Sequence, residues 1–481
     1  MNRMGFGGPP AEIQRLTALD HEAAISSLLD YERIPDPTPD PSWAYPDPQG
    51  IRNFRLSVKA APKDQAQKLR QAENRVQFQR LQELRGWWLN RMASGPRPFQ
   101  EKMVLFWHGH FATSYQKVAM VPNPSYLMWR QNELFRRLAT GNWLEMLNFV
   151  AKDPAMLVWL DQWKSRKPHA NENFARECME LFALGIGHYT EKDVTEAARA
   201  LTGWSYDPVG QIFIYRPIFH DTGAKTVLGL TGNLTGGDFL AQIVRQPQSA
   251  RFITAKLWNF FAGQMPPAPL NQALAEVFSA NGGNFKPFLR VLFRSEEFYS
   301  PAIMGNAVKS PVEWLVGTAR MLECPLPPPA LCANMLRNLG QDLFAPPNVK
   351  GWDGGLSWIN TNTLLARYND AAVLVHGAMV PQKMARPRPV DMMTDSEAAA
   401  EKAAPRVKVG GVDADKILTA AERADKTALV AALGRRLLQS NLAASQETAL
   451  RDFLGMRRGI SNEEILAAIR LVMATPEYQV V

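Results

Sequence analysis

The sequence has few cysteines and no long apolar run. Only Cys178, Cys324 and Cys332 occur among 481 residues, and no CxxC pair is present, so neither a disulfide framework nor a cysteine-ligated zinc site is predicted. No run of about 18 apolar residues occurs, and the amino terminus lacks an apolar stretch of signal-peptide length. We therefore expect a soluble protein with no membrane span, cytoplasmic as the chain is written.

Several short catalytic motifs are also missing. The chain has no nucleophile elbow, no dinucleotide-binding glycine fingerprint and no kinase signature. Segment 223–226 (GAKT) lacks the spacing of a phosphate-binding loop. Segment 221–223 (DTG) occurs once, whereas aspartic proteases need two copies in an all-β setting. These absences exclude several well-marked enzyme classes and leave the reaction open.

The chain does contain enough apolar and aromatic material for a large core. Hydrophobic residues make up 46% of it, with 13 Trp and 23 Phe, which excludes a disordered or fibrous protein. We predict a mainly α fold: a large multi-helix domain with a small inserted β-hairpin and a small C-terminal helical appendage. Helical periodicity supports this in ten segments: 11–30, 64–93, 126–150, 172–184, 191–203, 248–263, 270–280, 285–294, 311–322 and 360–377.

The predicted organisation has three parts. Residues 1–380 form the main helical domain, with the hairpin at about 211–229. Residues 381–416 are rich in proline, alanine and charge and lack aromatics, which predicts a flexible linker. Residues 417–481 form a C-terminal helical module.

That module echoes an earlier part of the chain. Segment 468–479 matches 288–299 at a constant offset of 180 residues, with Arg290 aligned to Arg470. In both copies an amphipathic helix ends at Ser295 or its counterpart Thr475, which we expect to cap the following turn. The pattern favours a duplicated helical module over a duplicated active site.

The formal net charge of +8 is unevenly placed. Residues 1–50 hold three basic and eight acidic side chains, a balance of −5, whereas residues 51–102 hold twelve and four, a balance of +8. Arginines at positions 70, 75, 80 and 85 turn about 140° per step around a helix, so they make no single stripe. No reading motif accompanies them, and no nucleic-acid partner is predicted. The basic segment either pairs with the acidic one or offers a docking surface.

Several blocks of the sequence, in order, resemble the bacterial domain of unknown function family 1800. The resemblance extends over nearly the whole chain. The blocks are NRMGFG at 2–7, LFWHGHFATS at 105–114, NENFARE at 171–177, ELFALG at 180–185, YTEKDV at 189–194, ALTGW at 200–204, HDTG at 220–223 and WINTNTLLAR at 358–367.

The resemblance implies no established catalytic residue. It implies instead a candidate partner, because members of this family are often encoded beside proteins of the domain of unknown function family 1501. Those proteins are related to alkaline phosphatases and sulfatases and often carry a twin-arginine export signal. Relatives commonly have a longer leader before the block at 2–7, so a missing leader or an exported partner would place this protein in the periplasm or outside the cell.

Two histidines separated by one residue are the most suggestive candidates for metal ligands. His108 and His110 lie in WHGHF at 107–111. We expect Gly109 to end a helix, with His108 closing it and His110 starting an extended stretch. Imidazole is a common ligand for zinc, iron and copper, but this short pattern alone favours buried, hydrogen-bonded histidines over metal ligands.

The helix at 171–184 carries the second candidates. On a helical wheel Glu177 lies beside the apolar stripe, so it is the carboxylate we expect to be partly buried. Glu180 lies one turn on. The two could hold a metal or act as acid and base, or Glu177 could be a buried carboxylate paired with an arginine.

The remaining candidates are a His-Asp pair and two tryptophans. His220 and Asp221, at the tip of the predicted hairpin, could bind a metal or orient a substrate, although Asp-Thr-Gly is also ordinary turn chemistry. Trp352 and Trp358 flank a glycine-rich loop, where exposed indole rings could stack on sugars of a polysaccharide. Tryptophan is also a common core residue.

Two functional hypotheses follow from these candidates. In the first, the protein is a metal-dependent hydrolase acting with a phosphatase- or sulfatase-like partner, with His108, His110 and Glu177 as metal ligands and Glu177, Glu180, His220 and Asp221 as catalytic groups. The cofactor is then a divalent metal, and Trp352 and Trp358 contact the substrate. In the second, it is a non-catalytic helical scaffold that binds a partner protein or a carbohydrate.

Overall fold

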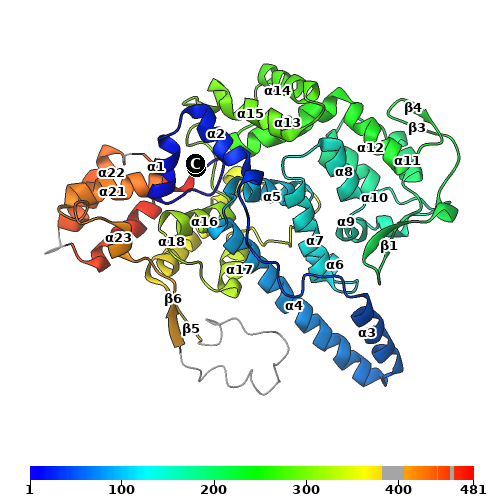
Figure 1. Cartoon of the computed structure of the whole chain (residues 1–481), viewed down its shortest axis with the longest axis horizontal. Helices are drawn as coiled ribbons and strands as arrows, with labels where there is room; N and C mark the ends of the chain where they lie inside the picture. The colour runs from blue at the N-terminus through cyan, green and yellow to red at the C-terminus, as the bar shows by residue number, and fades with distance from the viewer. Residues whose placement is uncertain (382–405, 441, 456–459) are drawn as a thin grey trace.

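The computed structural model is mainly helical, which confirms the predicted fold class (Figure 1). It describes residues 1–381, 406–440, 442–455 and 460–481. Three small two-stranded antiparallel sheets accompany the helices within this part of the chain. No described helix is both long and apolar enough to cross a bilayer.

The N-terminal helices show how capping residues set the boundaries. Asp20 accepts a hydrogen bond from the Ala23 backbone N–H at 2.8 Å, which splits the predicted helix 11–30 in two. Pro62 separates a second pair of antiparallel helices that project from the body (Figure 1). The elements are α1 (Pro10–Thr17), α2 (His21–Leu29), η1 (Tyr31–Arg33), α3 (Pro48–Ala60) and α4 (Lys63–Ser94).

The next helices form the centre of the molecule. The predicted helix 126–150 is broken because the Asn142 side chain caps a new helix through the N–H groups of Leu144 and Glu145. The elements are α5 (Pro98–His110), α6 (Tyr115–Val118), α7 (Pro124–Arg137), α8 (Trp143–Ala151), α9 (Pro154–Trp159), η2 (Gln162–Lys164), α10 (Asn173–Glu177), the π-helical turn η3 (Cys178–Ala183) and α11 (Glu191–Ala200).

The predicted hairpin pairing is wrong. Residues 212–215 do not pair with 225–229; each forms its own ribbon with a nearer neighbour. The reason is local, because Asp207 accepts from the Val209 N–H and closes a tight turn that returns the chain onto 204–207. The elements are β1 (Trp204–Asp207), β2 (Ile212–Tyr215), η4 (Pro217–Phe219), β3 (Lys225–Val227) and β4 (Leu230–Gly232).

The remaining elements complete the body and the C-terminal region. Most of the predicted linker lies outside the described residues; its last part contains a strand and a short helix. The elements are α12 (Gly236–Arg245), α13 (Pro247–Ala262), α14 (Ala268–Ala280), α15 (Phe285–Arg294), η5 (Glu296–Tyr299), α16 (Pro311–Met321), α17 (Pro329–Asn338), η6 (Gly355–Trp358), α18 (Thr361–His376), β5 (Ala378–Pro381), β6 (Arg406–Val409), α20 (Ala414–Ile417), α21 (Lys426–Leu438), α22 (Ala444–Gly455), α23 (Asn462–Met473) and η8 (Glu477–Gln479).

The sequence echo corresponds to a repeated arrangement of elements. In both regions three helices are followed by a 3₁₀ turn, α13–α14–α15–η5 and α21–α22–α23–η8. The two aromatic rings of the turns, Phe298 and Tyr478, are both buried. Arg3 donates to the Phe298 carbonyl at 2.5 Å and lies 3.7 Å from its ring. Lys309 donates to the Tyr478 carbonyl at 2.7 Å and lies 4.1 Å from its ring, so each turn is held by one cation in the same way.

The capping residues of the echo act differently from the prediction. The hydroxyls of Ser295 and Thr475 do not cap the following turn; each donates back to a carbonyl of the preceding helix, Leu292 or Val472, at 2.9 Å. They therefore satisfy the end of the helix before them.

Helix α5 lies in the centre of the core (Figure 1). All of its residues except Gly109 are buried, although five of them, Gln100, Glu101, Lys102, His108 and His110, are polar. A polar group inside a core needs a hydrogen-bond partner, because its burial without one costs about 1–7 kcal/mol of folding free energy. The contacts of these five residues therefore shape the surrounding fold.

Candidate functional site

The strongest electrostatic cluster in the core centres on Glu101. Its carboxylate accepts from Arg136 Nε at 2.6 Å, Arg91 Nε at 2.9 Å and Trp88 Nε1 at 2.9 Å. Burial would raise its pKa, but the charges and hydrogen bonds of Arg136, and then of Arg91, outweigh burial and lower it. Arg91 also pairs with Asp36, which joins the acidic N-terminal segment to the basic one.

The neighbouring Lys102 holds the N-terminus of the chain. Its buried ammonium donates to the Gly5 carbonyl at 3.0 Å and pairs with Glu313 of α16. The block at 2–7 is therefore fastened to the centre of the fold by α5. Glu101 and Lys102 are thus consecutive charges of one buried helix that bind different, distant parts of the chain.

The prediction that Gly109 ends the helix is wrong. Helix α5 continues to His110, so His108 and His110 lie on different sides of it. His108 Nε2 accepts a hydrogen bond from the Phe344 backbone N–H at 3.1 Å, and its ring packs edge-on against Trp88. Burial, and then the charge of Arg85, lowers the pKa of His108 to about 3. A neutral imidazole that accepts from the backbone acts as a core residue here.

His110 lies inside a cage of aromatic rings. Its ring contacts those of Phe106, Trp107, Phe111 and Trp143. It also contacts Phe182, and the centroids of these two rings are 6.0 Å apart. Neither ring nitrogen makes a hydrogen bond of good geometry within the described residues. Burial, and then the charge of Lys256, lowers the pKa of His110 well below its usual value; the nearby backbone of Phe182 opposes this only in part.

The Glu177 helix contains a π-helical turn that a regular helical wheel does not anticipate. Glu177 is half-buried, as predicted, but no arginine or other group bonds its carboxylate within the described residues. Burial, and then the neighbouring charge of Glu180, raises its pKa. Glu180 accepts from the Tyr189 hydroxyl at 2.8 Å. Among the described residues Glu180 therefore has a bonded partner, whereas the Glu177 carboxylate has none.

His220 and Asp221 diverge although they are adjacent in sequence. His220 is buried, and its Nδ1 donates to the Thr202 carbonyl at 2.9 Å, which leaves Nε2 without a partner in the described part of the chain. Asp221 instead accepts two hydrogen bonds from Arg199, at 2.7 and 3.2 Å. These bonds lower the pKa of Asp221 to about 2. Asp221 therefore fastens its turn to α11.

The two tryptophans of the glycine-rich loop do not lie together at the surface. Trp358 is buried beside Gly340, whereas Trp352 is only partly exposed, with its ring 5.6 Å from His108. Gly351 has a positive φ of 87°, and a Cβ added to it would lie 2.5 Å from the Gly109 carbonyl, so the close approach of the loop to α5 requires glycine at position 351.

The candidate residues meet only in part. The His110 segment contacts the Glu177 helix through Phe182, that is, through the apolar side of that helix. Within residues 1–381, 406–440, 442–455 and 460–481 no group of three or more His, Cys, Asp or Glu side chains could hold a metal ion. The structure thus does not assemble His108, His110 and Glu177 as one ligand set.

Comparison with known proteins settles the family. The family model described as protein of unknown function (DUF1800) matches residues 1–480, nearly the whole chain. The chain belongs to the DUF1800 family. The resemblance seen in the sequence blocks is thereby confirmed. No curated protein and no solved structure matches the chain.

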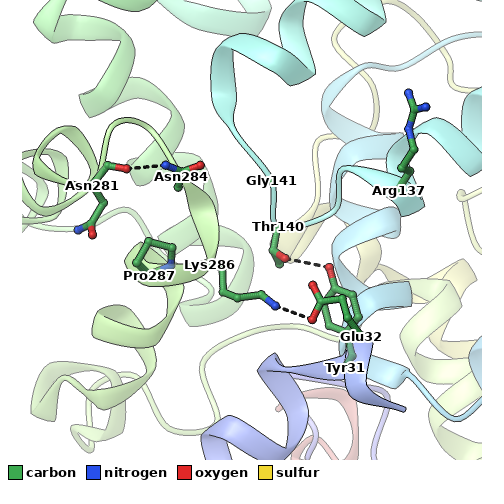
Figure 2. Close-up of a pocket in the computed structure, with 9 residues that line it drawn as sticks. All are labelled: Tyr31, Glu32, Arg137, Thr140, Gly141, Asn281, Asn284, Lys286 and Pro287. Atoms are coloured by element: carbon green, nitrogen blue, oxygen red, sulfur yellow. Dashed lines mark hydrogen bonds and ion pairs between the residues drawn. The ribbon is translucent and has the colours of Figure 1, made fainter. Parts of the chain in front are cut away.

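One polar pocket of this DUF1800 protein opens at the surface between α7–α8 and α14–α15 (Figure 2). Its cavity volume is about 400 Å³. Figure 2 shows that the Lys286 side chain extends across it to Glu32, and that the Tyr31 hydroxyl meets Thr140. The polar side chains in the middle of the pocket therefore bind one another and stabilise the junction.

Sequence reasoning missed the Glu101 and Lys102 clusters of this DUF1800 chain. A signal for them was present, because an acid and a base stand together in PFQEKMVLFWHGHF at 98–111, where apolar residues occupy every face of a helix. Charges in such a run must be buried with partners. The partners themselves, Arg91, Arg136 and Glu313, could not be identified from spacing.

Proposed function

We propose that this protein is a non-catalytic helical scaffold that binds a partner protein through an apolar ridge on η6 and α18. The observation that carries this is the exposure of four large apolar side chains there. Leu356 is 80% exposed and Leu365 60%, and the partly exposed Leu364 and Tyr368 continue the ridge. Positions 364, 365 and 368 share one side of α18.

A rigid base supports the ridge. Trp358, the last residue of η6, is buried, and the Asn360 side chain caps α18 by accepting from the Thr363 N–H at 3.0 Å. On the other side of α18, Arg367 donates to Gln479 and to the Lys309 carbonyl, both at 2.8 Å, so the helix is fixed to the body. Exposed apolar side chains on a fixed helix are typical of protein-binding surfaces.

The chemical groups nominated from the sequence support the same proposal. His108 accepts from the Phe344 backbone N–H, Glu180 accepts from Tyr189 and Asp221 is bonded to Arg199. Each of these contacts holds two parts of the fold together. A group already used in this way is not available as a ligand or base without breaking its contact.

The chemistry of the ridge favours a protein over a polysaccharide. Sugar rings stack on flat aromatic faces, whereas three of the four ridge residues are leucines, and the Tyr368 ring already has Arg470 4.9 Å from its centroid. The partner that the family resemblance suggests is a phosphatase- or sulfatase-like protein of the domain of unknown function family 1501.

The test is a direct binding measurement between the purified chain and a purified family-1501 protein from the same genome. We expect Leu365→Asp and Leu356→Asp to weaken binding by at least about tenfold, because a charge would enter an apolar contact. The matched control is Met265→Asp, which alters a 60% exposed side chain between α13 and α14. Unchanged binding in both ridge variants, or no binding by the wild type, would contradict the proposal.

The hydrolase hypothesis keeps one supporting observation. Glu177 is a half-buried carboxylate with a raised pKa and no bonded partner among the described residues, as a general base would be. The experiment is turnover of activated phosphate and carboxylate esters with added divalent metals, comparing the wild type with Glu177→Gln. Turnover that Glu177→Gln abolishes while the protein stays folded would favour a hydrolase over the scaffold.

A further inference from the structure

The outward side of α3 is a basic face. Arg52, Arg55, Leu56 and Lys59 follow the i, i+3, i+4, i+7 spacing of one helix side, and all four are exposed. The arginines of α4 form no stripe, as the sequence predicts, but those of α3 do. Leu56, 66% exposed, stands in the middle of the three cations.

The basic face is exposed to solvent. The less exposed residues of α3, Ile51, Phe54 and Val58, lie on a neighbouring side of the helix; α3 packs against α4, and the pair projects from the body (Figure 1). Residues 48–76 hold seven basic and two acidic side chains, a balance of +5. Arg52, Arg55 and Lys59 make no hydrogen bond or ion pair within the described residues.

A second surface of the same chain has the opposite charge. Residues 172–196, which include α10, η3 and α11, hold six acidic and two basic side chains, a balance of −4. Within the described residues the Glu177 carboxylate makes no hydrogen bond or ion pair, and the loop after η3 presents Ile186, which is 79% exposed. Gly185 and Gly187 flank Ile186 with φ values of 85° and 86°, so the loop turns sharply and keeps this side chain outward.

We propose that these two surfaces bind each other between two copies of this chain. The cations of the α3 face meet the acidic surface at 172–196, and Leu56 meets Ile186. The contact gives each surface a bonded partner, because within the described residues neither the half-buried Glu177 carboxylate nor the exposed Arg55 guanidinium makes a hydrogen bond or an ion pair. It is independent of the partner-binding ridge on α18.

The composition of the α3 face favours a protein surface over a lipid bilayer or a nucleic acid. A membrane-bound helix inserts its apolar side, and the apolar side of α3 is already packed on α4. Nucleic-acid binding requires cations that track a phosphate backbone, whereas this face places an apolar side chain at its centre. An apolar residue ringed by arginine and lysine is typical of a protein interface.

The interface is small and rich in charge, so its strength should depend on salt. A single 13-residue helix face covers less than the roughly 800 Å² per partner of a stable complex, and exposed ion pairs are screened within about 8–10 Å at physiological salt. We therefore expect reversible association that is strongest at low ionic strength.

The experiment measures the mass of the purified full-length chain in solution as its concentration increases, at low and at high salt. The wild type should associate at low salt and dissociate as salt is added. Arg55→Glu and Glu177→Lys should each be monomeric alone, because each places like charges opposite one another. The exposed Arg33→Glu on η1 is the matched control and should associate as the wild type does.

Mixing the two variants provides the decisive arm. The carboxylate introduced at position 55 of one variant would then face the ammonium introduced at position 177 of the other. In the second contact of the same dimer, the unchanged Arg55 of the Glu177→Lys variant faces the unchanged Glu177 of the Arg55→Glu variant. The mixture should therefore associate although neither variant does so alone. A wild type that stays monomeric at low salt would overturn the proposal, as would a mixture that stays monomeric. If the monomeric wild type instead bound anionic vesicles or RNA, and Arg55→Glu abolished that binding, the basic face of α3 would be assigned to the membrane or the nucleic acid.

Discussion

Helices α3 and α5 have the same length, 13 residues, and both begin with proline, yet they use their charges in opposite ways. The charges of α5 are buried, and Glu101 and Lys102 each have partners from distant parts of the chain. The charges of α3 are exposed and unpaired within the described residues. The difference indicates that α5 organises the fold, whereas α3 is free to contact another molecule.

The largest expected effect is at Glu101. Glu101→Gln removes the counter-charge of Arg91 and Arg136 while they stay buried, which we expect to lower the free energy of unfolding by about 3–5 kcal/mol. Denaturant unfolding followed by circular dichroism measures it. The control is Glu145→Gln at an exposed position, for which we expect the free energy of unfolding to change by no more than about 0.5 kcal/mol. If Glu101→Gln lowered the free energy of unfolding as little as Glu145→Gln does, the buried charge of α5 would contribute no more to stability than an exposed one.

A smaller effect concerns pH. The folded-state pKa of His108, about 3, lies below its unfolded value near 6.5, so the unfolded chain binds more protons between these values. The stability that His108 contributes is therefore complete above pH 6.5 and is lost as the pH falls. We expect about 2 kcal/mol of loss between pH 6.5 and pH 5 from this group, measured by urea unfolding.

The control for the pH prediction is His108→Gln, which keeps an acceptor for the Phe344 N–H and cannot titrate. Its loss of stability over the same range should be smaller than that of the wild type by about the same 2 kcal/mol. Equal pH dependence in the two proteins would show that His108 is not buried as a neutral ring.

The smallest effect is expected on α3. Arg55→Ala and Lys59→Ala remove exposed charges without bonded partners and should change the free energy of unfolding by no more than about 0.5 kcal/mol. The same denaturant unfolding measures it. A loss above about 1 kcal/mol in either variant would mean that the α3 face supports the fold.

Local sequence was sufficient for most helices and for the family. The periodicity of 285–294 predicts α15 with the observed bounds, because its apolar spacing and helix ends are local features. The splitting of 11–30 and 126–150 was predictable in principle, since Asp20 and Asn142 are capping residues. The ribbon pairing was not, because several short apolar stretches compete for the same strand partner.

The candidate site residues show more clearly what local sequence cannot predict. Sequence spacing identified Glu177 as a half-buried carboxylate, but it could not show that the helix changes to a π-helical turn directly after Glu177. It also placed His108 and His110 at a helix end, whereas the buried surroundings of α5 allow the helix to continue through Gly109. Whether a buried polar group is a ligand or a core residue depends on its neighbours, which come from distant segments.

The sequence by itself determined the helical fold class, the family and the local positions of charge, because periodicity, capping and blocks of residues are properties of short segments. Only the tertiary structure decided which charges are neutralised. Glu101 meets Arg136 across 35 residues, and Lys102 meets Glu313 across 211. In the described part of the chain Arg55 meets no carboxylate, since α3 projects from the body (Figure 1). Packing, which brings distant segments into contact, makes the same kind of residue structural in one helix and available for binding in another.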